Sequence, residues 1–470
     1  MPGTSRRTFL KTVAASTAFS TFTIGGTKSS AKVIGANERI NIGVAGINGR
    51  GGSHMSAFSG QNNCQVTYLI DPDSSLFGSR SKRIEASGGN KPNCVQDVRE
   101  ALDDKNLNAV SIATCNHWHS LIAIWACQAG KDVYVEKPLS HNIHEGRILV
   151  ETAKKNNCIV QHGTQGRSSG SWRSLAADIA EGKRGKLTVS RGFCYKQRGS
   201  IGMKQPGAPP KELDFNIWLG PAPLQPYHGN LVHYNWHWFW DTGNGDIGNQ
   251  GVHQMDVARW LIPGATLPKS VISVGGRFGD KDQGQTPNTQ ITVMDYGESL
   301  LVFEVRGLKT GRKVTNEVTF DKNAPAKKTA VASHEGVKSP TGDRGPGGIF
   351  DNFISCVRTR KADQLDAHVL EGHYSSALCH LANLSYRLGE DLPFDAKKNA
   401  FGDNKVAANT FERMLDHLKD NNVKLSETNY RVGRMLTIDP MNERFVNDNE
   451  ANELLTRKYR KPFTVPEKVV

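Results

Sequence analysis

A glycine-rich turn and a later aspartate form a pattern that can hold a dinucleotide. The sequence INIGVAGINGRG at 40–51 runs from an apolar strand into a turn that opens a helix, and backbone N–H groups there can receive a pyrophosphate. After a second apolar strand at 64–70 comes Asp71, whose carboxylate can accept both adenosine ribose hydroxyls and would repel a 2′-phosphate. The pattern favours NAD over NADP, although a tight turn without a nucleotide uses the same residue types. The turn residues expected at the cofactor are Gly46, Asn48, Gly49, Arg50 and Gly51.

Two more apolar strands end in polar residues and would bring them to the same sheet edge. They are NAVSIATCNHWH at 108–119 and DVYVEKP at 132–138, and the helical run at 120–130 between them ends at Gly130. Ligands of open parallel sheets bind at the carboxyl ends of the strands. The residues delivered to that edge are Thr114, Asn116, His117, Trp118, Glu136 and Lys137.

Taken in order, these motifs resemble the Gfo/Idh/MocA oxidoreductases, a family that includes glucose-fructose oxidoreductase and inositol dehydrogenase. The resemblance covers residues 38–390 and rests on GINGRG, Asp71, TCNHWH, VEKPLS at 135–140, VQHGTQGRS at 160–168 and GDIGNQGVHQMDVARW at 245–260. It implies an α/β fold, a Rossmann doubly wound parallel sheet followed by an α+β domain with an open, mainly antiparallel sheet. It also implies bound NAD and a homo-oligomer, a dimer or tetramer formed through the second sheet.

The resemblance assigns acid and base chemistry to a small set of residues. Lys137 is expected beside the nicotinamide and the substrate hydroxyl, and Gln165 on the cofactor side. The family pattern has an Asp and a His four residues apart on one helical face, and the matching residues are Asn249 and His253. An amide cannot take a proton at neutral pH, so Asn249 could instead hydrogen-bond a sugar hydroxyl, with Asp246 as a substitute carboxylate.

Oxidation of a secondary hydroxyl needs a base near neutrality while hydride passes to the nicotinamide. Burial and the positively charged ring should lower the pKa of Lys137 toward that range. His253 titrates near neutrality by default and could share or relay the proton. A surface lysine and a structurally satisfied histidine are the alternatives for these two residues.

Aromatic residues just before this pair are candidates for binding a sugar. Residues 234–240 read YNWHWFW, and aromatic faces pack against the C–H faces of sugars. Packing of a loop against the core is an equal alternative. The predicted substrate contacts are Trp236, Trp238, Arg167 and Tyr195.

The chain is expected to divide into four parts, because 470 residues exceed one ordinary domain. A signal peptide at 1–36 precedes an NAD-binding domain at 37–162 and an α+β domain for substrate binding and oligomerisation at 163–394. The lysine- and glycine-rich segment 308–345 is expected to be an exposed insertion of the second domain. The last part, 395–470, is expected to hold one amphipathic helix at 405–419 and an extended tail.

The N-terminus carries an export motif. Residues 5–11 read SRRTFLK, a twin-arginine pattern, and the apolar stretch after it is too short to span a membrane. We therefore expect export to the periplasm or an equivalent compartment, with no stable membrane span. Twin-arginine export carries folded proteins, so it also predicts tightly held NAD.

Composition narrows the range of partners. The net charge is +13, but the basic residues are dispersed and no nucleic-acid-binding motif is present, so no nucleic-acid partner is predicted. His117, His119 and His253 come without carboxylate or cysteine spacing, and no metal is predicted. Eight cysteines without CxxC spacing favour buried free thiols.

Three functions remain open from the sequence. The leading one is an NAD-dependent oxidoreductase acting on a secondary hydroxyl of a carbohydrate-like small molecule, namely a sugar, cyclitol or glycoside. The second is an NAD-dependent glycosidase that works by transient oxidation and elimination. The third, suggested by Asn249 in place of the family's Asp, is a non-catalytic NAD-binding scaffold.

Overall fold

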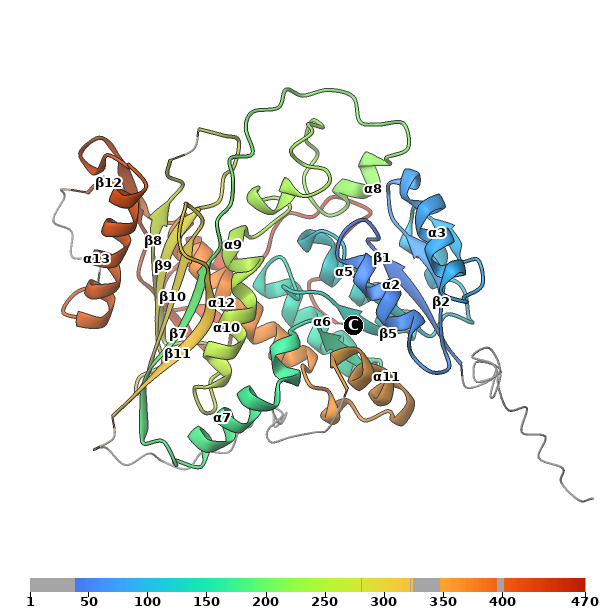
Figure 1. Cartoon of the computed structure of the whole chain (residues 1–470), viewed down its shortest axis with the longest axis horizontal. Coiled ribbons are helices and arrows are strands. Elements are labelled where there is room, and N and C mark those ends of the chain that lie inside the picture. The colour runs from blue at the N-terminus through green and yellow to red at the C-terminus, as the bar shows by residue number, and fades with distance from the viewer. Residues whose placement is uncertain (1–38, 280, 322, 324–346, 395–400, 470) are drawn as a thin grey trace, which may run out of the picture.

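The computed structural model describes residues 39–279, 281–321, 323, 347–394 and 401–469. The predicted signal peptide, 1–36, lies outside the described residues. Residues 322 and 324–345 of the predicted insertion also lie outside them. Figure 1 shows a first domain, blue to cyan, beside a second sheet that is seen edge-on, with the C-terminus returning to the first domain. Among the described helices, none is long and apolar enough to cross a membrane.

Six parallel strands form the first sheet, in the spatial order β3-β2-β1-β4-β5-β6. This order is that of the dinucleotide-binding Rossmann fold, whose ligand crevice lies between β1 and β4, where the strand order reverses. The strands are β1 Ile40–Ala45, β2 Cys64–Ile70, β3 Asn93–Val95, β4 Ala109–Ile112, β5 Asp132–Val135 and β6 Val160–His162. The helices between them are α2 Gly51–Ser59, α3 Phe77–Ala86, α4 Val98–Leu102, α5 Asn116–Gln128 and α6 Ile143–Lys155.

The second sheet has nine strands and is mainly antiparallel. Its path runs β11-β7-β10-β9-β8-β13-β12, with β14 beside β8 and β15 beside β14, and only β7 and β10 pair in parallel among the described strands. The predicted fold class is thereby confirmed. The strands are β7 Lys186–Tyr195, β8 Ser270–Gly276, β9 Thr289–Asp295, β10 Leu300–Arg306, β11 Lys313–Asp321, β12 Glu390–Pro393, β13 Asn429–Val432, β14 Leu436–Asp439 and β15 Arg444–Phe445. The helices are α7 Gly170–Ala180, α8 Phe215–Leu219, α9 Gly245–Gly248, α10 Gly251–Trp260, α11 Ile349–Thr359, α12 Val369–Arg387, α13 Lys405–Asp420 and α14 Asn449–Glu453.

Helices cover both faces of the second sheet, as Figure 1 shows. Side chains alternate along a strand, so Phe303 of β10 faces the core shared with α10 and α12, and Val302 faces the opposite side. There Val302 packs in one cluster with Met414 of α13. The inner helix α10 is thus held between the sheet and the first domain, which fixes the residues at its start.

Two segments of the C-terminal half differ from the sequence expectation. β11 lies inside the predicted insertion 308–345 and forms the edge of the sheet, paired with β7. Its side chains are partly or fully exposed, as an edge strand allows, and this hides it in a polar sequence. β13 lies in the predicted helix-and-tail region and pairs with β8, so the tail adds a strand to the second sheet.

Candidate active site

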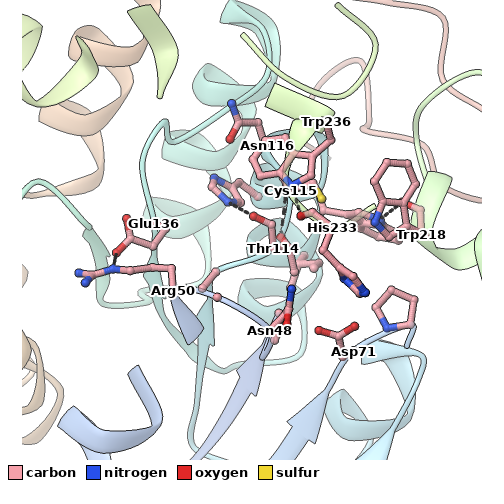
Figure 2. A pocket seen from close by; sticks show the side chains of 18 of the residues that line it. Asn48, Arg50, Asp71, Thr114, Cys115, Asn116, Glu136, Trp218, His233 and Trp236 are labelled. Atoms are coloured by element: carbon pink, nitrogen blue, oxygen red, sulfur yellow. Dashed lines mark hydrogen bonds and ion pairs between the residues drawn. The ribbon is translucent and has the colours of Figure 1, made fainter. Parts of the chain in front are cut away.

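A cavity of about 310 Å³ opens at the carboxyl ends of the first sheet's strands. Its floor comes from the first domain and its roof from α8 and the loop after it. Figure 2 shows Asn48 and Asp71 on one side of the space, with Trp218, His233 and Trp236 on the other. The sequence-predicted residues that line it are Gly46, Asn48, Gly49, Arg50, Asp71, Thr114, Asn116, Trp118, Glu136, Lys137, Trp236 and Asn249.

The glycine turn is shaped for close approach of a ligand. Gly46 has a φ of 80°, and a Cβ there would lie 2.5 Å from the Ala113 carbonyl oxygen, so a larger residue does not fit. A Cβ on Gly49 would meet no atom within 4 Å, because the turn faces open space. Among the described residues, none accepts a hydrogen bond from the backbone N–H of Asn48, Gly49 or Arg50. Unpaired N–H groups before α2 suit the pyrophosphate of a dinucleotide.

Asp71 lies at the end of β2 on the floor of the cavity. Its Oδ2 accepts a hydrogen bond from the Ile47 N–H at 2.9 Å, and its Oδ1 accepts one from the Asp73 N–H at 3.0 Å. Burial raises the pKa of Asp71 and these two hydrogen bonds lower it; burial is the larger effect, and the pKa is about 6. A carboxylate oxygen can accept more than one hydrogen bond, so both atoms remain able to receive ribose hydroxyls.

Glu136 ties the glycine turn to the strand that carries Lys137. Its Oε1 accepts hydrogen bonds from Arg50 Nε at 2.7 Å and from His54 Nε2 at 3.1 Å. Burial alone would raise the pKa of Glu136, but His54, Arg50 and Lys137 hold it well below its usual range. Glu136 is therefore a fixed carboxylate that positions Arg50 at the cavity.

Lys137 points across the domain boundary to Asn249, which lies between α9 and α10. Its Nζ donates to the Asn249 backbone oxygen at 3.0 Å and lies 3.4 Å from Asn249 Oδ1. Burial lowers the pKa of Lys137, Glu136 opposes that change, and the charge of Arg50 adds to it. The arrangement gives a partly buried amine whose proton affinity is reduced and whose position is set by two oxygens of one residue.

His253 lies in α10 beyond Asn249 and does not line the cavity. Burial, followed by the charge of Lys137, lowers the pKa of His253 to about 3, so the ring is neutral. Gln165 also lies outside the cavity lining, and its Nε2 is 3.4 Å from the Tyr134 hydroxyl. Gly51 does not line the cavity either, because it is the first residue of α2 and packs over Gly46.

Three predicted substrate contacts are corrected by the structure. Arg167 is fully buried and paired with Asp256 and Glu371, so its charge is used inside the protein. Tyr195 donates from its hydroxyl to Glu304 at 2.6 Å, within a separate hollow of the second sheet. Trp238 lies under the Arg198 guanidinium, 5.3 Å from the ring centroid, and lines another small cavity.

Two further candidates have structural partners instead. Asp246 receives hydrogen bonds from Arg198 Nε at 3.0 Å and Nη2 at 2.6 Å, so it does not substitute for the missing carboxylate at Asn249. The ring nitrogens of His117 lie 3.2 Å from the Thr242 carbonyl oxygen and 3.0 Å from that of Trp218. His117 therefore joins the two domains behind the cavity. It does not line the cavity, so the prediction that it contacts the cofactor is wrong. Within the described part of the chain, no group of three His, Cys, Asp or Glu side chains is placed to hold a metal ion.

Sequence reasoning missed much of the cavity roof. His233, Tyr234 and His237 come from the loop before α9, and Ile217 and Trp218 from α8. The aromatic run at 234–240 was a visible signal, but it does not tell which rings face inward. His233 Nε2 lies 3.0 Å from Asp73 Oδ2 and so closes the roof against the floor near Asp71.

The fold and the turn together define an NAD-binding oxidoreductase architecture. Residues 40–164 match the family model described as oxidoreductase family, NAD-binding Rossmann fold. Residues 182–296 match the model of the same family's C-terminal alpha/beta domain, and the two matches cover about half of the chain. The chain belongs to the Gfo/Idh/MocA oxidoreductase family, and its first domain is the NAD-binding one.

Several curated proteins are similar to part of this chain. Levoglucosan dehydrogenase of Pseudarthrobacter phenanthrenivorans is 24% identical over 304 residues, 60% of this chain and 71% of that protein. Glycosyl hydrolase family 109 protein 2 of Shewanella sp. (strain ANA-3) is 29% identical over 180 residues, 34% of this chain and 40% of that protein. The scyllo-inositol 2-dehydrogenase (NAD(+)) of Bacillus subtilis is 27% identical over 200 residues, 41% of this chain and 47% of that protein. The chain thus spans less than half of the last two relatives.

Solved structures share the two-domain fold. The WlbA dehydrogenase from Bordetella pertussis, in complex with NADH and UDP-GlcNAcA, has a TM-score of 0.54 at 17% identity, covering 74% of this chain and 97% of that one. Levoglucosan dehydrogenase in complex with NADH has a TM-score of 0.52 at 18% identity, covering 73% of this chain and 97% of that one. At these identities the likeness establishes the fold.

Proposed function

We propose that this protein is an NAD-dependent oxidoreductase that oxidises a secondary hydroxyl of a sugar, cyclitol or glycoside. The observation that carries the proposal is the place of Lys137. Its amine lies in the same cavity as the unpaired N–H groups of the glycine turn and the carboxylate of Asp71. The named activities of levoglucosan dehydrogenase and scyllo-inositol 2-dehydrogenase support the class of substrate.

The cofactor would be held by the turn residues Asn48, Gly49 and Arg50 and by Asp71. Bound NAD supplies the hydride acceptor. Lys137 takes the hydroxyl proton, because burial lowers its pKa and so favours the neutral amine that can act as a base. Asn249 holds the amine through its backbone oxygen and Oδ1. Its side chain is an amide, which takes no proton at neutral pH, so the proton stays on Lys137.

His253 has a supporting part in this proposal. Its ring is kept neutral by burial and by the charge of Lys137. A neutral imidazole can pass a proton on by accepting at one nitrogen while it releases the proton of the other, without holding a second charge. Trp236, at the roof, provides an apolar surface for the C–H groups of the substrate ring.

The test is direct measurement of cofactor and turnover. Purified protein is denatured, and the mass of any released nucleotide is determined. The stripped protein is then loaded with NAD or NADP and mixed with a panel of pyranoses, cyclitols and methyl glycosides. Accumulation of NADH absorbance with at least one of them is expected. NAD-loaded protein that reduces no cofactor and releases no aglycone across the panel contradicts the proposal and favours the non-catalytic scaffold.

The second candidate is a glycosidase that oxidises and re-reduces its substrate through bound NAD. The similarity to glycosyl hydrolase family 109 proteins favours it. It predicts release of p-nitrophenol from p-nitrophenyl glycosides with no net NADH, and exchange of a ring proton in deuterated water. The oxidoreductase predicts stoichiometric NADH and an intact glycosidic bond in a single turnover.

We also propose export by the twin-arginine route, supported by the SRRTFLK motif at 5–11. Replacing Arg6 and Arg7 by Lys should leave the protein in the cytoplasmic fraction, measured by fractionation and immunoblotting. Unchanged periplasmic localisation of that variant contradicts the route.

A further inference from the structure

His237 is a cavity residue that the proposed acid and base chemistry does not use. It lies in the short helical turn Asn235–Trp238 and lines the same cavity as Lys137, with 8% of its surface exposed. Its ring stacks on Trp236 with the centroids 3.6 Å apart and an interplanar angle of 18°. Its main chain is held from behind by Gly243, where a Cβ would lie 2.5 Å from the His237 Cα. The imidazole is therefore fixed in orientation.

The hydrogen bonds of His237 define which nitrogen is free. Nδ1 lies 2.6 Å from the Tyr234 carbonyl oxygen, and a carbonyl can only accept, so Nδ1 carries the proton. Burial, then the nearby charges of Lys137 and Arg198, lower the pKa of His237 to about 3, which keeps the ring neutral. Nε2 is then an acceptor, and no donor among the described residues meets it.

An acceptor that no protein donor meets is satisfied by water or by a ligand, and a ligand that displaces the water must supply a donor of its own to avoid a loss of affinity. The Tyr234 carbonyl excludes the neutral tautomer in which Nε2 carries the proton, because Nδ1 would then face the carbonyl oxygen as a second acceptor. The neighbouring charges named above are positive, so a cationic ligand group is disfavoured at this position. A neutral hydroxyl is the donor that fits.

We propose that His237 Nε2 accepts a hydrogen bond from a second hydroxyl of the substrate, while Lys137 meets the hydroxyl that is oxidised. The site then selects polyhydroxylated rings over simple secondary alcohols and rejects analogues in which that second hydroxyl is absent or methylated. This inference rests on the proposed oxidoreductase function and makes His237 a specificity-determining residue of the same site.

The test compares deoxy analogues in the native protein and in His237→Phe, which keeps an aromatic ring on Trp236 but removes the acceptor. Stripped protein is loaded with NAD, and kcat/KM is measured for methyl β-D-glucopyranoside and its 2-, 3-, 4- and 6-deoxy derivatives. In the native protein, one derivative should lose about tenfold or more relative to the parent. In His237→Phe that derivative and the parent should become equal within about twofold, while the other ratios stay unchanged.

His228→Phe is the matched control, because His228 lies in the same loop, packs on Phe239 and does not line the cavity. It should keep the native pattern of ratios. Identical deoxy penalties in the native protein and His237→Phe overturn the inference. If His237→Phe does not fold, His237→Gln is used, because its side chain retains an acceptor and should preserve the loss of kcat/KM for the deoxy derivative. Equal kcat/KM for that derivative and the parent in His237→Gln counts against the inference.

A separate readout distinguishes failure of the proposed function. If the native protein binds NAD but turns over no member of the panel of pyranoses, cyclitols and methyl glycosides, the proposed substrate class is wrong. The nitrogen-15 shifts of His237 then decide the inference, assigned by their loss in His237→Gln. The inference is supported if Nδ1 is protonated, Nε2 is not, and the Nε2 resonance shifts when methyl β-D-glucopyranoside is added. A protonated Nε2, or an Nε2 resonance that does not shift, overturns it.

Discussion

Replacing Asp71 by Asn should stabilise the cofactor-free protein while weakening NAD binding. Asp71 is 7% exposed, and its burial raises the pKa from 3.8 to about 6. That difference corresponds to about 3 kcal/mol by which the folded state disfavours the carboxylate at neutral pH. The amide side chain of Asp71→Asn would keep one acceptor oxygen for the two N–H groups of Ile47 and Asp73, and losing one such bond costs about 1 kcal/mol. The expected net gain is about 2 kcal/mol, the difference between these two effects.

The sign of the pH dependence follows from linkage. Because the folded pKa of Asp71 is raised, the unfolded chain releases its proton first as pH rises from 3.8. Native stability therefore falls relative to the Asn variant between pH 3.8 and about 6, and the difference is constant above that range. Below pH 3.8 the carboxyl is protonated in both states and contributes no difference.

The assay is urea unfolding of stripped protein at about pH 3 and about pH 7.5, on either side of the range in which Asp71 titrates, followed by tryptophan fluorescence. Glu85→Gln, an exposed carboxylate of α3, serves as the control and should change the midpoint little at either pH. Titration with NAD should show weaker binding to Asp71→Asn, because the amide offers one acceptor to the ribose hydroxyls in place of two. A variant that is no more stable than the native protein at the higher pH refutes the argument that burial destabilises this carboxylate.

The remaining predictions concern selectivity, chemistry and the tail. Native protein should bind NAD more tightly than NADP, and Asp71→Ala should narrow the gap in a fluorescence titration; equal or tighter NADP binding to native protein contradicts this. Lys137→Ala should abolish turnover with NAD still bound, and His253→Ala should lower kcat by ~10²–10⁴-fold; full activity of Lys137→Ala refutes the mechanism. Phe463→Ala should lower the free energy of unfolding by about 3–5 kcal/mol in a urea titration, because Phe463 is 2% exposed and packs edge-on to Trp118, 5.4 Å between centroids; an unchanged midpoint contradicts a structural tail.

The first domain could be predicted well because its signals are local. A parallel sheet covered by helices on both faces has strands that are continuously apolar in sequence. The turn from β1 into α2 requires a positive φ at Gly46, which glycine adopts without strain. β3, which the sequence did not lead us to expect, has only three residues. Short strands acquire their structure from the neighbour they pair with, and that neighbour is distant in the sequence.

The same reasoning explains the errors in the C-terminal half. β11 is polar because one of its edges pairs with β7 and the other is exposed, so its composition is that of a loop. β13 is four residues long, and its Tyr430 and Val432 are buried only after it pairs with β8 and α13 packs over it. Long-range pairing of this kind leaves no periodicity for a sequence window to detect.

The residues of the candidate site also differ in how well the sequence predicts their position. Residues on the cofactor side lie at strand ends, so the order of strands already places Asp71, Thr114 and Lys137 at one edge. On the substrate side, rings from one aromatic run point in different directions: Trp236 lines the main cavity, and Trp238 turns to Arg198. The direction of each ring is set by the irregular backbone of a loop.

Placement also changes what each imidazole can do. A sequence motif selected His253 for its distance from Asn249 along one helix, but His237 is the ring that reaches the cavity with a free acceptor nitrogen. Both rings are neutral, because burial beside Lys137 opposes a second positive charge. Under the proposed function, Lys137 is then the group that takes the hydroxyl proton, His253 relays it, and His237 directs a second hydroxyl of the substrate. On the proposed function, the chemistry of this site depends on one partly buried lysine, and its selectivity on a loop histidine whose Nδ1 proton is held by a backbone carbonyl.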